Sequence, residues 1–419
     1  MLPQKQLYYI DKRLKEIKAN DRVFGGIVVV LIGDLAQLPP VQATPAYDQR
    51  MYMNGNKKDL DSQCGRKIWS DYFRTVIKLS ENKRLDPTDP DAADFNMFLE
   101  CLADGNVTEN QYKQVIKICS RDTLGEQEWR ERGFNESSTT HLFTRNVDVR
   151  KKNYEEIQSL NQPILKVIAY NSSATARAKH PDFFQQMPNH EYFSRGAKVL
   201  LTKNLKPEYG LANGTTGIVK DFIWNDDDRV VTHDNISDAC NLFVWVDFGK
   251  QYSGPSFFDE DTYSDRLGWF PIFALNSTNF EVGKAGQQNG GYKMLGRVML
   301  PLKLAWAWTI HKSQGQTIKE KIVLHLGDDE KTVGLSYVAF SRAKRFSNVG
   351  IQGGLSANRI MTLISKKPSL KIRKIADERL DKHFEETTAK LEIIQQERMA
   401  RAQANVFAST SANFYDPDI

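Results

Sequence analysis

The hydrophobic pattern at the start of the chain predicts a helix followed by a strand. Apolar residues first recur at helical spacing, which predicts an amphipathic helix; they are Leu2, Leu7, Ile10, Leu14 and Ile17. Six consecutive aliphatic residues at 27–32 then predict a strand buried on both faces, as in a parallel sheet covered by helices. A parallel sheet with one strand this early needs others, and we expect them upstream of Met1.

The middle of the chain changes rhythm twice. A helix and a short strand at 76–79 are followed by a helical stretch at 86–136, and a strand, a helix and another strand then run from 140 to 170. Between about 197 and 300, short alternating strands separated by NG, DDD and GG turns predict a β-barrel-like insertion. Strand and helix alternation returns after residue 304. An α/β domain interrupted by a β module is therefore the expected architecture.

The C-terminal part carries a long charged helical pattern from Ser369 to about Asn405, and the last 14 residues look frayed. This helix is expected to be solvated or docked, and a partner-binding role is the alternative. The aromatic residues Trp306, Trp308 and Phe340 are tempting platforms for base stacking, but their strand and helix positions favour a place in the core.

Composition and charge leave the partner open. Lys and Arg exceed Asp and Glu by five in 419 residues, which permits nucleic acid as a partner without requiring it. The four cysteines are far apart with no C-x-x-C pair, so we expect reduced, mostly buried thiols and no metal site. The N-terminus is too charged for a signal peptide, and no apolar run approaches the roughly 20 residues of a membrane helix. A soluble, intracellular, monomeric protein is expected, with no membrane partner.

The string GDLAQLPPV follows the first predicted strand directly. Gly33 ends the strand, so Asp34 and Gln37 would lie beyond its carboxyl end, where open parallel sheets bind ligands. Pro39 and Pro40 stiffen the loop and keep it out of a helix. The alternative is a strand exit in which Asp34 only caps backbone N–H groups.

The string AWAWTIHKSQGQT places several donors at a strand-to-helix turn: Thr309, His311, Lys312, Ser313 and Gln314. Hydroxyls, an ammonium and helix-start N–H groups suit a phosphate backbone, and Gly315 lets the backbone turn close to a ligand. Taken singly, His311 is more often a structural histidine.

The string YVAFSRAKR places Arg342 at the end of an apolar helical turn. A guanidinium on such a rigid element could meet a transferring phosphoryl group, a role worth roughly three to five orders of magnitude in rate. A surface salt bridge is the alternative for a lone arginine.

These strings resemble a known family, the petite-integration-frequency helicases, which are RecD-like members of helicase superfamily 1 that move 5′ to 3′ on single-stranded DNA. FGGIVVVLIGDLAQLPPV is similar to their motif III, LSENKRL to motif IV, LPLKLAWAWTIHKSQGQT to motif V and SYVAFSRAKR to motif VI. NLKPEYGLANGTTGIV resembles the segment that leads into their SH3-like insertion. Order and spacing agree along residues 20 to 355.

The resemblance implies an α/β fold of RecA-like parallel-sheet domains, the first incomplete, with a small SH3-like β-barrel insertion in the second. The implied segments are the first RecA-like domain at 1–85, a helical connector at 86–136, the second RecA-like domain at 137–205 and 301–365, the β insertion at 206–300, and the C-terminal helix and tail at 366–419.

The resemblance also implies roles for individual residues. Gln37 would sense the γ-phosphate or its attacking water, with Asp34 holding that loop, and Arg84 and Arg342 would be arginine fingers. The implied nucleotide-binding residues are Gly33, Asp34, Gly315 and Gln316, and the implied DNA-binding residues are Asn146, Thr309, His311, Lys312 and Ser313. No residue is assigned to a metal. The implied partners are single-stranded DNA and duplex junctions. The implied roles are telomere maintenance, recombination and repair. The implied compartment is the nucleus, with the mitochondrion as the alternative.

Two family features are absent from the 419 residues: the P-loop G-x-x-x-x-G-K-[ST] and the Asp-Glu pair of the magnesium-binding strand. In the family a Met follows that pair by two residues, so by resemblance Met1 lies just after it. We expect a C-terminal fragment that alone neither hydrolyses ATP nor unwinds DNA, whereas the complete enzyme would use ATP and Mg²⁺. The alternatives are a non-catalytic single-strand-binding remnant and an interaction protein that works through the 369–405 helix.

Overall fold

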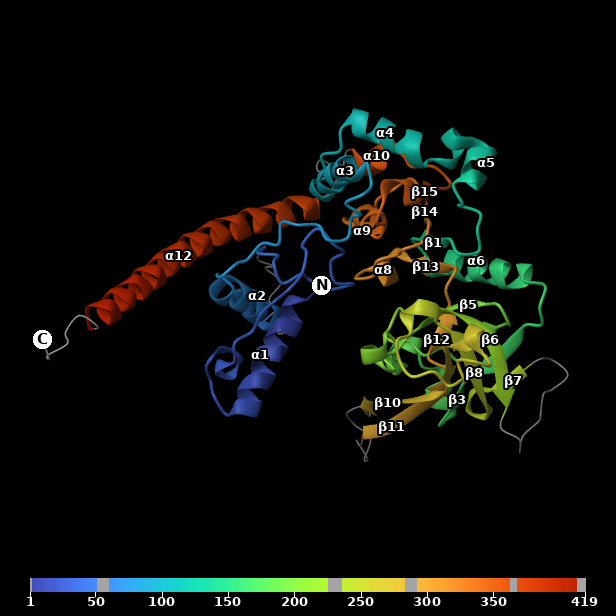
Figure 1. The fold of residues 1–419 in the computed structure, drawn as a ribbon. Coiled ribbons are helices and arrows are strands. Elements are labelled where there is room, and N and C mark those ends of the chain that lie inside the picture. Colours follow the sequence, from blue (N-terminus) through green and yellow to red (C-terminus); the bar gives the residue numbers. More distant parts are fainter. Residues whose placement is uncertain (1, 51–59, 225–235, 283–291, 362–367, 413–419) are drawn as a thin grey trace, which may run out of the picture. The chain divides into compact units, whose positions relative to one another are not determined.

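The computed structural model describes residues 2–50, 60–224, 236–282, 292–361 and 368–412. In the last of these ranges, the side chains are described as far as residue 401. The chain forms two compact units (Figure 1). Unit 1 comprises residues 1–123, 327–347 and 353–419, and unit 2 comprises residues 124–326 and 348–352.

Unit 1 is helical in its described residues. The predicted opening helix is confirmed as α1, and its apolar stripe packs on α2 through Leu7 and Ile68, with Phe24 in the same core. Gly65 permits this close packing, because a Cβ there would lie 1.8 Å from the carbonyl oxygen of Gln4. The helices are α1 (Gln4–Lys18), α2 (Leu60–Tyr72), α3 (Ala92–Asp104), α4 (Glu109–Cys119), α9 (Leu335–Phe340), α10 (Ala357–Ile360) and α12 (Pro368–Ala412).

A second core in unit 1 is aromatic and joins α3 to α9. The ring of Phe95 stacks on Phe346 at 4.8 Å and 9°, and Phe98 meets Phe340 edge-on at 5.2 Å. Such pairs add to the free energy of burial beyond their area. Phe340 therefore belongs to the core, as do Trp306 and Trp308 in unit 2, which confirms the core interpretation of all three.

The C-terminal helix α12 is bonded to three separate segments of unit 1. Arg373 donates to the carbonyl of Ala103 and Arg379 to that of Ser70, while the Thr387 hydroxyl accepts from the backbone N–H of Val76 at 3.1 Å. The helix continues to Ala412, so the prediction of a frayed end is wrong for 406–412. Residues 413–419 lie outside the described residues.

Two predicted strands of unit 1 are not strands. Residues 27–32 carry no strand assignment, and the side chains of Val28 and Ile32 are 89% and 91% exposed instead of buried. The segment at 76–79 is likewise unpaired, with Ile77 and Leu79 exposed. A strand exists only where a neighbour supplies N–H and C=O partners, and the described part of unit 1 contains no strand that could pair with either segment.

Unit 2 contains the predicted parallel sheet. Its order is β13-β1-β14-β15, and all three pairings are parallel. The buried apolar runs of these strands fit a sheet covered on both faces, and α6 (Asn146–Ser159) follows β1 directly. The strands are β1 (Thr140–Phe143), β13 (Ala307–Thr309), β14 (Ile322–His325) and β15 (Val349–Ile351), and the short helix α8 (Ile310–Ser313) follows β13.

The predicted β module is present in unit 2, where a five-stranded sheet has the order β12-β5-β6-β8-β9 with antiparallel pairings. Its strands are β5 (Lys198–Leu201), β6 (Thr216–Trp224), β8 (Leu242–Asp247), β9 (Trp269–Ile272) and β12 (Leu302–Leu304). Two smaller sheets contain β2 (Leu165–Ile168), β4 (His190–Phe193) and β7 (Ile236–Asp238), and β3 (Tyr170–Asn171), β10 (Leu275–Val282) and β11 (Tyr292–Met299). The remaining described α-helices are α5 (Arg121–Glu131) and α7 (Ala174–Ala178).

The four cysteines are free thiols, but only Cys119 is buried, so the prediction of mostly buried thiols is wrong. Cys64 and Cys240 are exposed. Among the described residues, no helix has the length and apolar character needed to cross a membrane.

Two histidines meet across the parallel sheet. His141 Nδ1 lies 3.1 Å from His325 Nε2, and the His325 ring stacks on Phe143 at 4.0 Å. Burial, followed by the charge of Lys152, lowers the pKa of His141 to about 2 and that of His325 to about 4. Both rings are therefore neutral at neutral pH.

This pair predicts that unit 2 loses stability in mild acid. Below the ordinary histidine pKa of 6.5 the unfolded chain binds protons that the folded chain excludes, so the free energy of unfolding falls by about 1.4 kcal/mol per pH unit for each histidine. Urea midpoints measured at pH 7, 6 and 5 by tryptophan fluorescence check this. The double variant His141→Gln/His325→Gln is the control, and an equal acid loss in variant and parent would contradict the prediction.

Candidate functional site

The tight turn at 34–37 holds its own shape through Asp34. The carboxylate Oδ1 accepts from the backbone N–H of Ala36 at 2.8 Å, and the carbonyl of Asp34 accepts from the N–H of Gln37 at 3.2 Å. Side-chain acceptors of this kind stabilise turns. The side-chain amide of Gln37 donates to Asp34 Oδ2 at 3.3 Å. Asp34 therefore positions Gln37, whatever else it contacts.

A glycine and a tyrosine bring α9 against this turn. Gly334 has φ +90°, and a Cβ there would lie 2.5 Å from the carbonyl oxygen of Ala36, so only glycine fits without a shift. The Tyr337 hydroxyl donates to Asp34 Oδ2 at 2.9 Å. Burial, together with the charge of Asp34, raises the pKa of Tyr337, so the phenol stays protonated and acts as a donor.

Two arginines meet at Ser341, next to the same turn. Arg84 Nη1 donates to the Ser341 carbonyl at 2.8 Å, and Arg342 Nη2 donates to the Ser341 hydroxyl at 2.7 Å. Arg342 is only 1% exposed, and its Nε donates to the Val338 carbonyl at 2.8 Å. Burial and the charge of Arg84 lower the pKa of Arg342 to about 10, an effect that Tyr337 and Asp34 partly offset.

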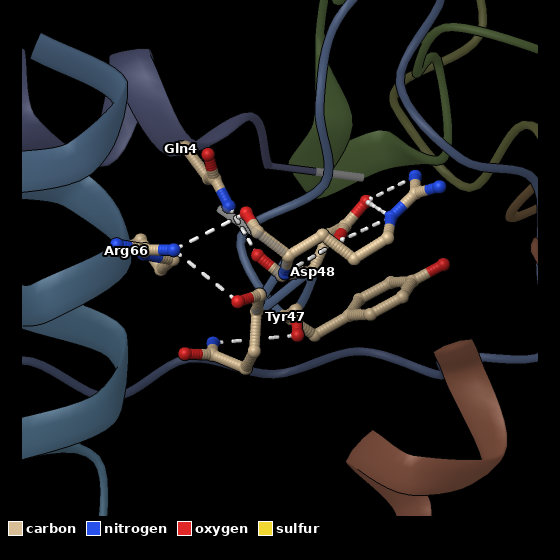
Figure 2. A network of polar contacts seen from close by, with 6 residues as sticks. Gln4, Tyr47, Asp48 and Arg66 are labelled. Carbon is tan, nitrogen blue, oxygen red and sulfur yellow. Dashed lines mark hydrogen bonds and ion pairs between the residues drawn. The ribbon is translucent and has the colours of Figure 1, made fainter. Parts of the chain in front are cut away.

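The loop that follows Pro40 is fixed from two helices (Figure 2). Gln4 of α1 donates to the Asp48 carbonyl at 2.5 Å, and Arg66 of α2 donates to the carbonyls of Gln49 and Arg50 at 3.2 Å. Burial raises the pKa of Tyr47, in the same loop, to about 12. A cavity of about 200 Å³ lies beside the loop; its lining includes Gln37, Tyr47, Arg50, Val333 and Arg373. The side chain of Gln37 thus lines a built cavity rather than open solvent.

In unit 2, the predicted phosphate-binding residues gather at one edge of the parallel sheet. Thr309 ends β13 and is the register partner of Phe143, which ends β1, and Asn146 follows three residues later at the start of α6. The carboxyl ends of parallel strands share an edge. The side chains of Asn146, His311 and Lys312 are exposed there. Thr309 caps α8, since its hydroxyl accepts from the N–H of Lys312 at 3.2 Å.

Lys312 keeps contact with solvent but has an unusual electrostatic environment. Desolvation by the surrounding chain, and then the positive charge of Lys303, lower the pKa of Lys312 to about 8, while Glu191 acts in the opposite direction. Burial also lowers the pKa of His311, which favours its neutral form. Lys312 is therefore charged below pH 8 and partly deprotonated near it, and an approaching anion would favour the charged form.

Other predicted residues lie elsewhere. Ser313 is buried and donates to the Ile310 carbonyl at 2.8 Å, so it supports the turn and does not face a ligand from solvent. Gln316 reaches the turn before β6 and donates to the Asn213 carbonyl at 3.4 Å, beside Gly214. Gly315 has φ +83°, which explains the glycine, whereas Gly33 is exposed and its Cβ position is open.

Gln316 also lines a second cavity of about 410 Å³, which includes the 212–216 turn and residues 316–320. Among the described residues, no three acidic, histidine or cysteine side chains come together as a metal site.

The structure therefore brings Asp34, Gln37, Arg84 and Arg342 together in unit 1, and Asn146, Thr309, His311 and Lys312 along one sheet edge in unit 2. The prediction overlooked Tyr337, which joins α9 to the 34–37 turn. The only available signal was its position five residues before Arg342 in the same string.

The fold and these groups define a mixed α/β protein with a parallel sheet whose strand ends carry polar side chains. Two family models match the chain: PIF1-like helicase at residues 1–113, and the 2B domain of the DNA helicase Pif1 at residues 184–222. The chain is therefore similar to PIF1-like helicases over its first 113 residues and to the Pif1 2B domain over residues 184–222.

Two curated relatives illustrate the likeness. The ATP-dependent DNA helicase Pif1 of Psychrobacter sp. is 28% identical over 84% of this chain and 52% of its own length. The ATP-dependent DNA helicase PIF1 of Candida albicans is 26% identical over 81% of this chain and 40% of its own length. The chain thus spans about half of the length of the first of these relatives and less than half of the second.

Solved structures agree on the fold. The Pif1 helicase of Candida albicans matches 84% of this chain and 70% of its own with a TM-score of 0.57, and Bacteroides Pif1 bound to single-stranded DNA matches 88% and 73% with a TM-score of 0.54. Both are 22% identical to this chain, so these likenesses concern the fold.

Proposed function

We propose that this chain is part of an ATP-dependent DNA helicase that couples nucleotide hydrolysis to 5′-to-3′ movement on single-stranded DNA and to duplex unwinding. One observation carries the proposal: in a chain similar to PIF1-like helicases, Arg84 and Arg342 share Ser341 beside the Asp34–Gln37 turn. Two neighbouring guanidiniums repel each other, and the charge of Arg84 is, after burial, the second cause of the lowered pKa of Arg342. An anion as highly charged as a triphosphate would relieve that repulsion.

Each residue of this group has a proposed task. Arg84 and Arg342 would neutralise charge on the transferring phosphoryl group, since positioning and charge neutralisation supply most of the catalysis in phosphoryl transfer. Gln37 would orient the attacking water, with Asp34 and Tyr337 holding its loop. Arg342 would need to turn its guanidinium outward, because it is buried in this structure. Bound Mg²⁺ would supply further charge neutralisation, and no ligand for it is assigned in this chain.

The finer fold assignment belongs to the same proposal. The parallel sheet of unit 2 would be the core of a RecA-like domain, the five-stranded sheet an SH3-like insertion, and residues 1–85 part of another RecA-like domain. The match to the Pif1 2B domain at 184–222 supports the insertion. We also propose that the protein is soluble and monomeric, and that it serves DNA repair, recombination and telomere maintenance in the nucleus.

DNA would be held at the edge of the parallel sheet in unit 2. Asn146, Thr309, His311 and Lys312 would contact phosphates, which position a strand without reading its sequence. Ser313 is not included, because its hydroxyl is buried. Bacteroides Pif1 has been solved in complex with ADP-AlF₃ and single-stranded DNA, and a second related structure concerns unwinding at forked duplex DNA by two Pif1 helicases. These complexes support the proposed ligands.

We expect the purified 419-residue chain to show no ATP turnover, because it contains neither the P-loop nor the Asp-Glu pair. A coupled assay for released phosphate, with and without single-stranded DNA, measures this. If the chain hydrolyses ATP and the substitution Arg342→Ala abolishes this activity, the expectation is contradicted. Arg342 would then take part in ATP hydrolysis in a chain that has no P-loop and no Asp-Glu pair.

We expect single-stranded DNA binding to weaken as the pH rises through about 8, because Lys312 loses its charge there. Below that pH the ammonium is present and contacts a phosphate; above it the contact is lost, which costs up to roughly tenfold in affinity and about one unit of salt slope. Fluorescence anisotropy with labelled oligo-dT between pH 7 and 9 measures both.

The matched control is Lys312→Arg, which stays charged over this range. Its DNA affinity should change less with pH than that of the parent, and Lys312→Ala should bind weakly at every pH. Identical pH profiles for the parent and Lys312→Arg would show that this lysine does not hold DNA.

The second candidate is a non-catalytic single-strand-binding protein derived from a helicase. The missing phosphate-binding strings favour it, since DNA contact in unit 2 does not depend on them. Adding ATP would leave its DNA affinity unchanged, whereas a nucleotide-responsive chain would bind DNA differently with ATP present. Anisotropy titrations with and without ATP separate the two.

A further inference from the structure

The outer face of the five-stranded sheet in unit 2 is aromatic. Side chains alternate along β8, so that Val244 and Val246 are buried while Phe243 and Trp245 lie on the other face. Across the register, Phe243 pairs with Ile223 of β6, and Trp245 pairs with Pro271 of β9. The other face of this sheet already packs on a core. The sheet therefore does not need apolar side chains on the face of Phe243 and Trp245 for its stability.

The rings form a continuous series rather than isolated contacts. Between ring centroids, Phe243 lies 5.0 Å from Phe273 and 6.0 Å from Trp245. Trp245 in turn lies 5.0 Å from Phe258 and 5.9 Å from Phe257. Phe257 and Phe273 are each 56% exposed. We call Phe243, Trp245, Phe257, Phe258 and Phe273 the aromatic face. Exposed contiguous apolar surface of this kind marks interaction sites.

Acidic residues border the aromatic face. The segment that follows Phe258 carries exposed carboxylates, at Asp259, Glu260, Asp261 and Asp265. Only Lys250 and Arg266 carry positive charge between residues 247 and 273, although the whole chain has a net charge of +5. The field beside the aromatic face is therefore negative, which opposes a phosphate backbone and attracts a cationic ligand.

One arginine of the chain already lies against rings at the border of the aromatic face, among them Phe258 of the face itself. The Arg266 guanidinium lies 4.7 Å from the Tyr263 ring centroid, 5.1 Å from that of Trp269 and 5.5 Å from that of Phe258. Arginine stacks on aromatic faces and pairs with carboxylates in a fork geometry. An incoming arginine would find both kinds of partner at the border of the aromatic face.

We propose that the aromatic face binds an extended, arginine-containing peptide segment of a partner protein, with apolar or proline side chains on the rings and guanidiniums on the acidic border. Extended proline-containing segments lose little conformational entropy on docking to aromatic surfaces. The exposed carboxylates attract a positively charged partner, and they repel the phosphates of nucleic acid. The proposal does not depend on the proposed nucleotide or DNA sites.

The test uses the full chain and a fluorescein-labelled peptide of repeated Pro-Pro-Arg triplets, with a Pro-Pro-Glu peptide as its counterpart, followed by fluorescence anisotropy. The parent chain should bind the arginine peptide, bind it less well as salt increases, and ignore the glutamate peptide. The double variant Phe257→Ala/Phe273→Ala should bind at least about tenfold more weakly, and Glu260→Gln/Asp261→Asn should also bind more weakly.

The matched control is Phe280→Ala, which removes an equally exposed ring from β10, outside the aromatic face; it should bind like the parent. All substituted side chains are exposed, so folding is not at risk, and circular dichroism verifies it. Absence of binding to the parent, or equal loss in the control, would overturn the proposal. So would oligo-dT binding or self-association that the Phe257→Ala/Phe273→Ala variant abolishes, because the face would then serve DNA or a second copy.

Discussion

Replacing Glu330 by alanine is expected to destabilise unit 1 by about 3–5 kcal/mol, because it leaves a buried guanidinium without its carboxylate. The side chains of Arg359 and Glu330 are inaccessible to solvent and lie 2.8 Å apart. Glu330 also accepts from the backbone N–H and the hydroxyl of Ser336, at 2.9 and 2.7 Å. Ser336 is the second residue of α9, so this ion pair holds the helix that carries Tyr337 and leads to Arg342.

The variant should therefore affect the site as well as the fold. Hydrogen exchange resolved by peptide is the suitable measurement, since it reports each unit separately, and protection should fall first in 335–342. The exposed Glu392→Ala in α12 is the matched control and should change protection little.

The double variant Glu330→Gln/Arg359→Met tests the cause. Burial raises the pKa of Glu330 and lowers that of Arg359, which indicates that pairing only partly offsets desolvation. Removing both charges should then cost less than the sum of the single substitutions. Additive costs would refute the ion pair as the source of the loss.

Replacing Arg297 by methionine is expected to destabilise unit 2 by about 3 kcal/mol or more, because several buried acceptors lose their donor. The side chain is fully buried in β11 and donates to the carbonyls of Met187, Ala176 and Lys179 and to the Asn171 side chain, at 2.8 to 3.1 Å. Its guanidinium also lies 4.4 Å from the Phe184 ring centroid. One side chain thus joins β11 to Asn171, to the carbonyls of the 176–179 segment and to that of Met187.

Urea unfolding followed by tryptophan fluorescence measures this, because every tryptophan except Trp69 lies in unit 2. The control is Lys293→Met on the same strand, which is exposed and should leave the midpoint unchanged. Arg297→Lys should recover only part of the loss, since one ammonium cannot reach all the acceptors. A midpoint for Arg297→Met equal to that of the control would rule out this role.

Local pattern was sufficient for elements that satisfy their own hydrogen bonds or pair with a neighbour in this chain. The stripe from Leu2 to Ile17 predicted α1, and the charged pattern after Ser369 predicted α12. The strand before Asn146 and the strand leading to Thr309 were also predictable, because their partners in the sheet lie within unit 2. The same reasoning failed at 27–32 and 76–79, where β-branched and aliphatic residues have no strand beside them.

The sequence predicted candidate site residues but not their geometry. The strings around Asp34, Arg84 and Arg342 singled out residues that the structure brings together, but nothing in them indicated that both arginines bond to Ser341. Likewise, Ser313 and Lys312 are neighbours in one string, yet one is buried and the other exposed. The arrangement depends on α9, which the buried ion pair of Glu330 and Arg359 holds.

The sequence by itself determined the opening and C-terminal helices, the β module and the resemblance to PIF1-like helicases, because these depend on periodicity and on strings of residues within single segments. The tertiary structure alone decided which polar groups meet, which are buried, and which strand-like segments become strands. The physical reason is that hydrogen bonds across a sheet, desolvation of charges and contacts between rings join residues far apart in sequence. The free energy of each such interaction depends on both partners, so it cannot be derived from the sequence of one segment.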